Sequence, residues 1–155
     1  MTDFSDMLRP DAVQTGVIAK NKKAVFQHLA TVASEILDAD PKMIADRLAA
    51  REKLGSTGFG GGVAIPHAKL EGLAQVTGVF ARLAEPVDFQ AVDDLPVDLV
   101  FMLLSPTDAG AVHRQALARV SRRLRDKAFL EKLRGGGSPD AVYALFTADE
   151  VRDAA

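Results

Sequence analysis

The spacing of apolar side chains predicts helices over much of the chain. Residues 21–37 place apolar side chains three or four positions apart, which is the period of a helix with one buried face. Residues 41–53 follow the same period and come directly after Asp40. Aspartate followed by proline is typical of a helix start, because the carboxylate accepts from free N–H groups and proline needs no partner there. Three more helices are expected near the C-terminus: after the loop at 105–108, over 126–134 and from 138.

Strands are predicted between these helices. Residues 12–18, the short apolar run 63–65 and the alternating run 74–83 are each expected to be extended. Residues 97–104 are apolar almost without interruption, which predicts a strand buried on both faces. Strands interleaved with amphipathic helices indicate an α/β sandwich.

The remaining stretches are expected to be irregular. Residues 1–11 are interpreted as a polar lead-in, and residues 135–137, all glycine, as a break between helices. Glu85 and Pro86 are interpreted as a turn. No stretch is long enough to be a linker, so the sequence predicts a single domain over 1–155.

Composition narrows the function classes. A net charge of −2 gives no electrostatic case for binding nucleic acid or an anionic membrane. The chain has no cysteine, which excludes disulfides and thiolate chemistry and fits a cytoplasmic location. The acidic N-terminus lacks the apolar core of a secretory signal. No stretch approaches the roughly 20 apolar residues that cross a bilayer, so no membrane insertion is expected.

Glycines crowd the segment that leads to His67. Residues 58–62 read GFGGG, and the absent side chains leave room beside the imidazole for another backbone or a bulky partner. Pro66 restricts the preceding Ile65 to an extended conformation. A histidine at the end of a strand with cleared surroundings suits a nucleophile that must meet a large partner.

The segment 55–72, GSTGFGGGVAIPHAKLEG, resembles the active-site signature of phosphotransferase-system IIA proteins of the fructose, mannitol and nitrogen-regulatory family. The overlapping run 51–58, REKLGSTG, also resembles this family. The sequences of both segments are most similar to the nitrogen-regulatory branch. The resemblance covers nearly the whole chain. It implies a mixed central β-sheet flanked by helices on both sides, and it implies no cofactor.

By this resemblance, His67 accepts a phosphoryl group from a small histidine-phosphorylated carrier, HPr or NPr. His113 matches the family's second histidine, which hydrogen-bonds the phosphoryl oxygens, and Arg51 matches an arginine that suits phosphate or a partner carboxylate. Weaker contacts with the phosphoryl group or the partner are expected from four more residues: Ser56, Gly60, Gly61 and Lys69.

One position departs from the family. Members often carry histidine or asparagine in the middle of the glycine loop, where this chain has Gly61. Any help from a side chain at that position is therefore absent. Phe59 is expected to widen an apolar rim for the carrier.

Other interpretations of the same residues are weaker. The glycines match neither a P-loop nor the dinucleotide fingerprint, because no lysine follows and Val63 replaces the third glycine. Two histidines without a recognised third ligand do not make a zinc site. His28 is expected to be partly buried or solvated, without function. One helix is rich in arginine, which is interpreted as a solvated face or a docking surface for an acidic partner: Arg114, Arg119, Arg122, Arg123 and Arg125.

The sequence therefore predicts a cytoplasmic phosphoryl carrier of the nitrogen-regulatory branch. The resemblance implies target proteins in nitrogen metabolism or potassium transport. Two alternatives stay open at this point: a fructose- or mannitol-type IIA protein that passes the phosphoryl group to a IIB domain, and a regulatory module that acts by binding alone.

Overall fold

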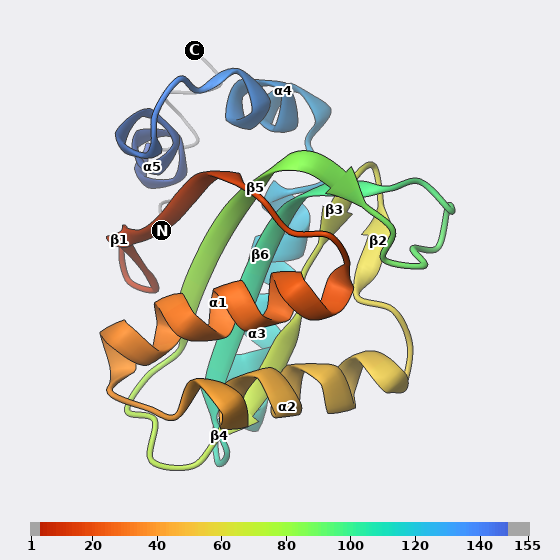
Figure 1. Ribbon diagram of the computed structural model, residues 1–155. Helices are drawn as coiled ribbons and strands as arrows, with labels where there is room; N and C mark the ends of the chain where they lie inside the picture. The colour runs from red at the N-terminus through yellow and green to blue at the C-terminus, as the bar shows by residue number, and fades with distance from the viewer. Residues whose placement is uncertain (1–3, 149–155) are drawn as a thin grey trace.

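The computed structural model describes residues 4–148. Its centre is a six-stranded sheet in which β1, β5, β6, β3 and β2 lie side by side and β4 also pairs with β6. Figure 1 shows α1 and α2 across one face of the sheet, α3 behind it, and α4 and α5 near its upper end. The predicted fold class, a mixed sheet with helices on both sides, is confirmed.

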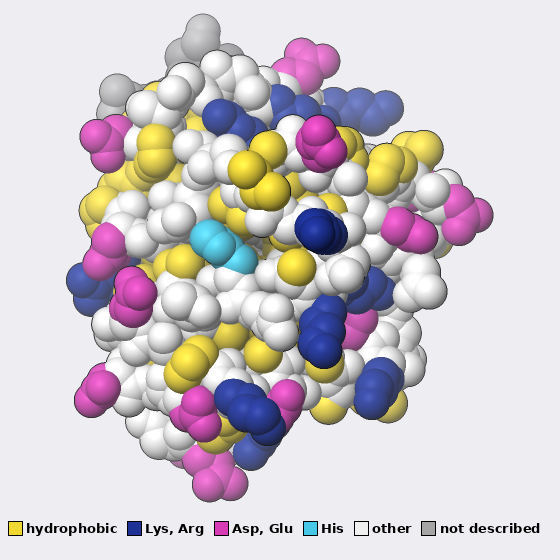
Figure 2. Space-filling view, viewed as in Figure 1, with side chains coloured by type: hydrophobic (Ala, Val, Ile, Leu, Met, Phe, Trp, Pro, Cys, Tyr) yellow, Lys and Arg dark blue, Asp and Glu magenta, His cyan; other side chains and the backbone are white. Residues whose placement is uncertain are grey.

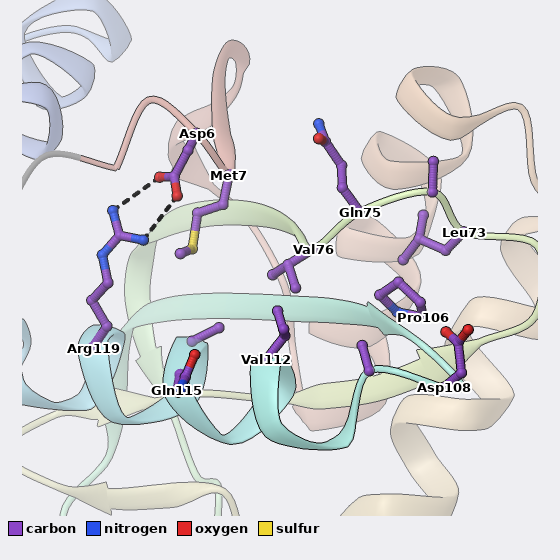
Figure 3. A pocket seen from close by; sticks show the side chains of 13 residues that line it. Asp6, Met7, Leu73, Gln75, Val76, Pro106, Asp108, Val112, Gln115 and Arg119 are labelled. Carbon is purple, nitrogen blue, oxygen red and sulfur yellow. Dashed lines mark hydrogen bonds and ion pairs between the residues drawn. The ribbon is translucent and has the colours of Figure 1, made fainter. Parts of the chain in front are cut away.

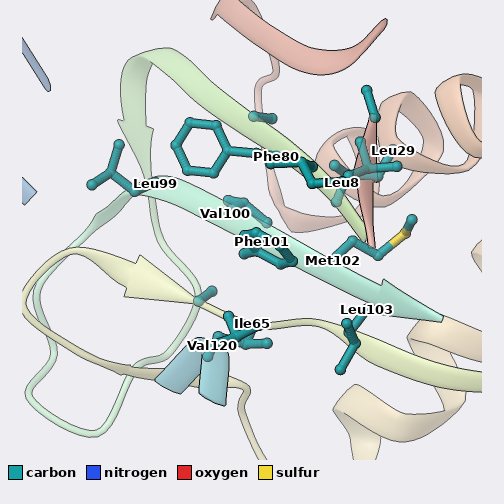
Figure 4. Close-up of a cluster of buried hydrophobic side chains, with 14 of the residues drawn as sticks. Leu8, Leu29, Ile65, Phe80, Leu99, Val100, Phe101, Met102, Leu103 and Val120 are labelled. Carbon is teal, nitrogen blue, oxygen red and sulfur yellow. The ribbon is translucent and has the colours of Figure 1, made fainter. Parts of the chain in front are cut away.

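The sheet is built around two long strands that run antiparallel to each other, β5 (Thr77–Val87) and β6 (Val97–Pro106). Parallel to β5 lies β1 (Leu8–Val17). Eight of the ten residues of β6 are buried, as the apolar run predicts for a strand covered on both faces. Phe80, Phe101 and Met102 of these strands form part of the core in Figure 4.

Two short strands follow one another along β6 and are separated by Ile65 and Pro66. They are β3 (Val63–Ala64) and β4 (His67–Leu70), both parallel to β6. The hairpin partner of β3 is β2 (Gly58–Gly60). Proline has no N–H to donate, but the Pro66 carbonyl still accepts from the amide of Leu103 at 2.9 Å. The ladder therefore resumes directly at His67, which begins β4.

The helices begin where the sequence predicts. In α1 (Lys22–Leu37) and α2 (Pro41–Lys53) the caps are Asn21 and Asp40, whose side chains accept from backbone amides of the first turn. Capping of the same kind starts α4 (Lys127–Gly135) and α5 (Pro139–Thr147). The remaining helix is α3 (Gly110–Arg123), which starts without a side-chain cap.

Two expectations about irregular segments are wrong. Residues 8–11 of the expected polar lead-in belong to β1, and Phe4, Met7 and Leu8 are buried because they cover the core beside α5. The expected turn at Glu85 and Pro86 lies inside β5. A proline is tolerated there because the pairing with β6 is irregular between Arg82 and Val87, so no regular ladder hydrogen bond is lost.

Strand boundaries also differ from those predicted. Extended structure begins at residue 8 rather than 12, and β3 ends before Ile65. The short strands β2 and β4 were not predicted, since three or four residues with glycines show no apolar period. Within the described residues, no helix is both long and apolar enough to cross a membrane.

Candidate functional site

His67 stands at the first position of β4, with its imidazole about half buried. Its Nδ1 lies 2.8 Å from the carbonyl oxygen of Ile65. A carbonyl only accepts, so Nδ1 carries the proton and Nε2 keeps its lone pair. The Ile65 carbonyl thus fixes which nitrogen of His67 keeps a lone pair.

Arg51 approaches His67 from the last turn of α2. Its Nε–H donates to Nε2 of His67 at 3.2 Å, and one terminal nitrogen donates to the Gly55 carbonyl at 2.9 Å. Since a guanidinium can only donate, this contact independently requires a lone pair on Nε2. Both contacts of the imidazole agree on the same tautomer.

His113 reaches the same place from the first turns of α3. The ring centroids of His67 and His113 are 5.5 Å apart, although 46 residues separate them in sequence. His113 is buried, and its Nδ1 lies 2.6 Å from the hydroxyl of Ser105 in β6. Sequence reasoning missed Ser105, because Ser105 and the proline after it were interpreted as the start of a loop.

Both imidazoles favour the neutral form. Burial lowers the pKa of His67, and the positive charge of Arg51 lowers it further, against opposing effects of the Ile65 carbonyl and Glu52. Burial also lowers the pKa of His113, helped by repulsion from His67, Lys69 and Arg114. A neutral His67 is the form that can act as a nucleophile.

Glu52 is a buried carboxylate directly behind this site, and sequence reasoning assigned it no role. It accepts from the backbone N–H and the hydroxyl of Thr57, and from Lys22 at 2.9 Å. Burial opposes ionisation, but the bonds from Thr57 and Lys22 hold the pKa of Glu52 below its usual range. The carboxylate thereby ties the start of the glycine loop to α1 and α2. Its place beside Arg51 in the sequence was the only available signal.

The weaker candidates lie around this centre with other partners. Ser56 donates to the Phe89 carbonyl at 2.7 Å and accepts from the Gly58 amide. The Gly61 amide donates to Asp93 at 3.0 Å. Gly60 has a positive φ of 109°, and a side chain there would approach the same carboxylate. These three residues shape the loop, and among the described residues none of them hydrogen-bonds the His67 side chain.

Two further candidates differ in exposure. Lys69 is exposed on β4, two residues after His67, and is near enough to lower the pKa of His113. Phe59 is half buried beneath the guanidinium of Arg125, which lies 5.5 Å from the ring centroid. His28 is half buried on α1, outside the site, in line with expectation.

Two arginines of the arginine-rich segment have partners within the protein. In the arginine-rich segment, Arg119 pairs with Asp6 at 2.9 Å, and Arg123 lies over the ring of Phe129. Figure 2 shows acidic and basic side chains interspersed on the face that carries α1 and α2. Among residues 4–148, no three His, Cys, Asp or Glu side chains are grouped closely enough to hold a metal ion.

Two clefts of about 810 Å³ lie away from the histidines. One runs beside α3 and is lined by Leu73, Val112 and the Asp6–Arg119 pair (Figure 3). The other lies between α1 and α2. Neither is lined by His67 or His113.

Comparison with known proteins gives consistent results. Residues 6–149 match the family described as phosphoenolpyruvate-dependent sugar phosphotransferase system, EIIA 2. A nitrogen regulatory protein of Bradyrhizobium diazoefficiens is 44% identical over 142 residues, covering 92% of this chain and 93% of the relative. A fructose-specific EIIA component of Haloferax volcanii is 41% identical over 143 residues, covering 92% and 93%.

The fold is similar to that of solved IIA proteins. Nitrogen regulatory protein IIA-Ntr from Neisseria meningitidis superposes with a TM-score of 0.86 at 35% identity, covering 92% of this chain and 97% of that one. IIA mannitol from Escherichia coli superposes with a TM-score of 0.72 at 23% identity, covering 87% and 96%, and supports the fold alone. This chain belongs to the type 2 EIIA family of the phosphotransferase system, among the relatives of its nitrogen regulatory IIA-Ntr proteins.

Proposed function

We propose that this chain is a single-domain phosphoryl carrier in which Nε2 of His67 accepts a phosphoryl group from the phosphohistidine of an HPr- or NPr-like protein. The observation that carries the proposal is the hydrogen bond that sets the tautomer of neutral His67. Its Nδ1 is bound to the Ile65 carbonyl, so the lone pair is on Nε2, next to Arg51 and close to His113.

The reaction exchanges one P–N bond for another. The Nε2 lone pair attacks phosphorus in line with the carrier's P–N bond. That bond breaks, and its electron pair returns to the nitrogen of the carrier imidazole. The proton on Nδ1 of His67 stays where it is, held by Ile65. This exchange of P–N bonds requires no cofactor, metal or redox partner.

Groups around His67 would stabilise charge on the transferred phosphoryl oxygens. Arg51 now donates to Nε2, and its fork can turn to the oxygens once the lone pair is used. His113 supplies a further donor, and Lys69 adds positive charge at the rim. We assign the other three predicted contacts to shaping the glycine loop against the carrier: Ser56, Gly60 and Gly61.

The nitrogen-regulatory branch is the better supported of the two phosphotransferase roles. The nitrogen regulatory relative from Bradyrhizobium diazoefficiens is 44% identical and matches over almost its whole length. We therefore propose that the phosphorylated fraction of a cytoplasmic carrier signals to target proteins in nitrogen metabolism or potassium transport. The 41% identity to a fructose-specific EIIA component keeps transfer to a IIB domain as the second candidate.

The test is reconstitution with phosphoenolpyruvate, enzyme I and HPr, with the mass of the intact protein as the readout. We expect one acid-labile phosphoryl group on the wild-type protein and none on His67→Ala. His113→Ala should be phosphorylated more slowly by about 10²-fold, as for loss of one charge-stabilising donor. His28→Gln is the matched control, because it changes a histidine outside the site. An unmodified wild-type protein would contradict the carrier function.

A second assay separates the two roles. Phosphorylated protein is mixed with fructose-type and mannitol-type IIB domains, and loss of the phosphoryl group from His67 is followed by mass. We expect no transfer to either domain. Rapid transfer to one of them would move the assignment to sugar uptake. If His67→Ala kept full activity in cells, the protein would act by binding alone.

A further inference from the structure

Ser105 is placed to control His113. In the pairing of β4 with β6, His67 lies opposite Leu103, and Lys69 lies opposite Ser105. Because side chains alternate along a strand, positions two apart share a face of the sheet. His67 and Ser105 are therefore on the same face, where α3 delivers His113 to both of them.

The hydrogen bond between Ser105 and His113 has a defined direction. Ser105 is 0% exposed, so its hydroxyl proton cannot be donated to water. Among residues 4–148, Nδ1 of His113, at 2.6 Å, is the one hydrogen-bond partner that accounts for this proton. If Nδ1 carried its own proton, the serine proton would be buried without an acceptor, which folded proteins avoid. The serine therefore donates, and Nδ1 of His113 accepts.

The direction of this bond sets the tautomer of His113. A neutral imidazole has one N–H, so acceptance at Nδ1 leaves the proton on Nε2. The neighbouring imidazole is held in the opposite state, because the Ile65 carbonyl keeps the proton of His67 on Nδ1. Two rings 5.5 Å apart thus present one lone pair and one N–H. Phosphoryl transfer needs this combination: a nucleophile, and a donor for the charge on the oxygens.

We propose that Ser105 is a positioning residue that holds His113 in the Nε2–H tautomer, so that His113 donates to the phosphoryl group while His67 attacks it. The role in transfer rests on the proposed function, whereas the tautomer itself is a property of the unphosphorylated protein. Ser105 touches neither substrate nor the reacting atoms and acts through His113.

The first measurement is ¹⁵N NMR of the histidine rings in the free protein, which identifies the protonated nitrogen without any carrier. We expect His113 to carry its proton on Nε2 and His67 on Nδ1. Ser105→Ala should turn the single His113 tautomer into a mixture, while Ser105→Thr, which keeps the hydroxyl, should preserve it. A proton on Nδ1 of wild-type His113, or an unchanged single tautomer in Ser105→Ala, would overturn the assignment.

The second measurement is the rate of phosphorylation by phosphorylated HPr. We expect Ser105→Ala to lower kcat about tenfold with KM for the carrier unchanged, as for a donor that is misplaced rather than removed. Ser105→Thr should restore the rate. If Ser105→Ala matched the wild type while His113→Ala was slow, the positioning role would be wrong and the carrier function would stand. If the wild type accepted no phosphoryl group, the carrier function would fail, and with it the role of Ser105 in transfer.

Discussion

The Nε–H of Arg51 donates at 3.2 Å to Nε2 of His67, the nitrogen that we propose as the phosphoryl acceptor. In the unphosphorylated protein the guanidinium therefore occupies the position that an incoming phosphoryl group needs. Arg51 also holds the Gly55 carbonyl, so its displacement is linked to the glycine loop. A carrier that presents negative oxygens gives the guanidinium a stronger partner than a neutral imidazole, which favours the exchange.

This contact predicts the pH dependence of the reaction. Burial and then the charge of Arg51 lower the pKa of His67, so the nucleophile stays neutral to a lower pH than a free histidine does. The phosphorylation rate should rise with pH through a midpoint below about 6.5, the ordinary value. In Arg51→Gln the midpoint should move to higher pH, because repulsion is lost while burial remains.

The midpoint is measured by NMR titration of the His67 ring and by the phosphorylation rate. Arg47→Gln is the matched control, since Arg47 lies one turn earlier on α2 and donates to the Lys69 carbonyl instead. Arg51→Gln should also slow phosphorylation by about 10²-fold at neutral pH. An unchanged His67 pKa in Arg51→Gln would show that the guanidinium does not act on the nucleophile.

Glu52 predicts how acid destabilises the protein. Burial opposes ionisation, but bonds from Thr57 and Lys22 lower the pKa of Glu52 in the folded state. Stability from this group is thus present above its ordinary pKa of 4.5 and is lost as pH falls through the lower folded value. Glu52→Gln leaves Lys22 without its charged partner and should cost about 3 kcal/mol at neutral pH.

Urea unfolding between pH 7 and pH 3 checks this prediction. Glu71→Gln, at an exposed carboxylate after β4, is the control and should change stability by less than about 0.5 kcal/mol. The loss in Glu52→Gln should shrink as the pH falls, since the wild-type carboxylate becomes neutral as well. A loss that is independent of pH would mean that shape, and not charge, sets the contribution of Glu52.

A pair of glycines separates backbone strain from crowding. Gly62 and Gly72 have nearly the same positive φ, 81° and 79°. A Cβ on Gly72 would meet nothing within 4 Å, whereas one on Gly62 would lie 2.6 Å from Arg134 and 3.0 Å from Asp98. Gly72→Ala should therefore cost about 1 kcal/mol from strain alone.

Gly62→Ala should cost about 3 kcal/mol, because it adds the displacement of the Arg134–Asp98 ion pair to the same strain. Thermal unfolding of both variants measures the difference. Equal losses would show that Arg134 moves aside freely and that this ion pair contributes little to the loop.

Long periodic segments of the fold were predictable because local pattern and tertiary packing agree there. Helix starts at Asp40 and Ser138 follow from capping chemistry, and the apolar run of β6 marks the central strand. The short strands β2 and β4 exist because of partners far away in sequence, so no local period reveals them. At Pro86 the local signal is misleading. Proline is typical of a turn, but it is tolerated inside β5 because the pairing with β6 is irregular there.

Some residues of the candidate site could be predicted from the sequence and others could not. The glycine loop and His67 are visible in the sequence, and family resemblance adds His113 and Arg51 to them. Ser105 was missed because nothing local marks a serine in a strand, and Glu52 was missed because its place beside Arg51 does not reveal its buried partners. Their roles come from what α3 and α1 bring next to them.

The last prediction concerns the far end of the chain. Phe146 of α5 is 1% exposed and packs against the rings of Phe4, Phe80, Phe101 and Phe129, with centroids 4.9 to 5.9 Å away. Its carbonyl also accepts from the amide of Phe4. Phe146→Ala should therefore cost about 3–5 kcal/mol through the cavity that it leaves.

Tyr143→Ala on the same helix is the comparison, and it should cost less because Tyr143 is only half buried. Urea unfolding gives both values. Among residues 4–148, the ring contacts of Phe146 do not include His67, so protein that remains folded should be phosphorylated at the wild-type rate. A slower reaction in folded Phe146→Ala would mean that packing under α5 helps to hold the histidine pair. A loss of stability below that of Tyr143→Ala would mean that the four remaining rings close over the cavity.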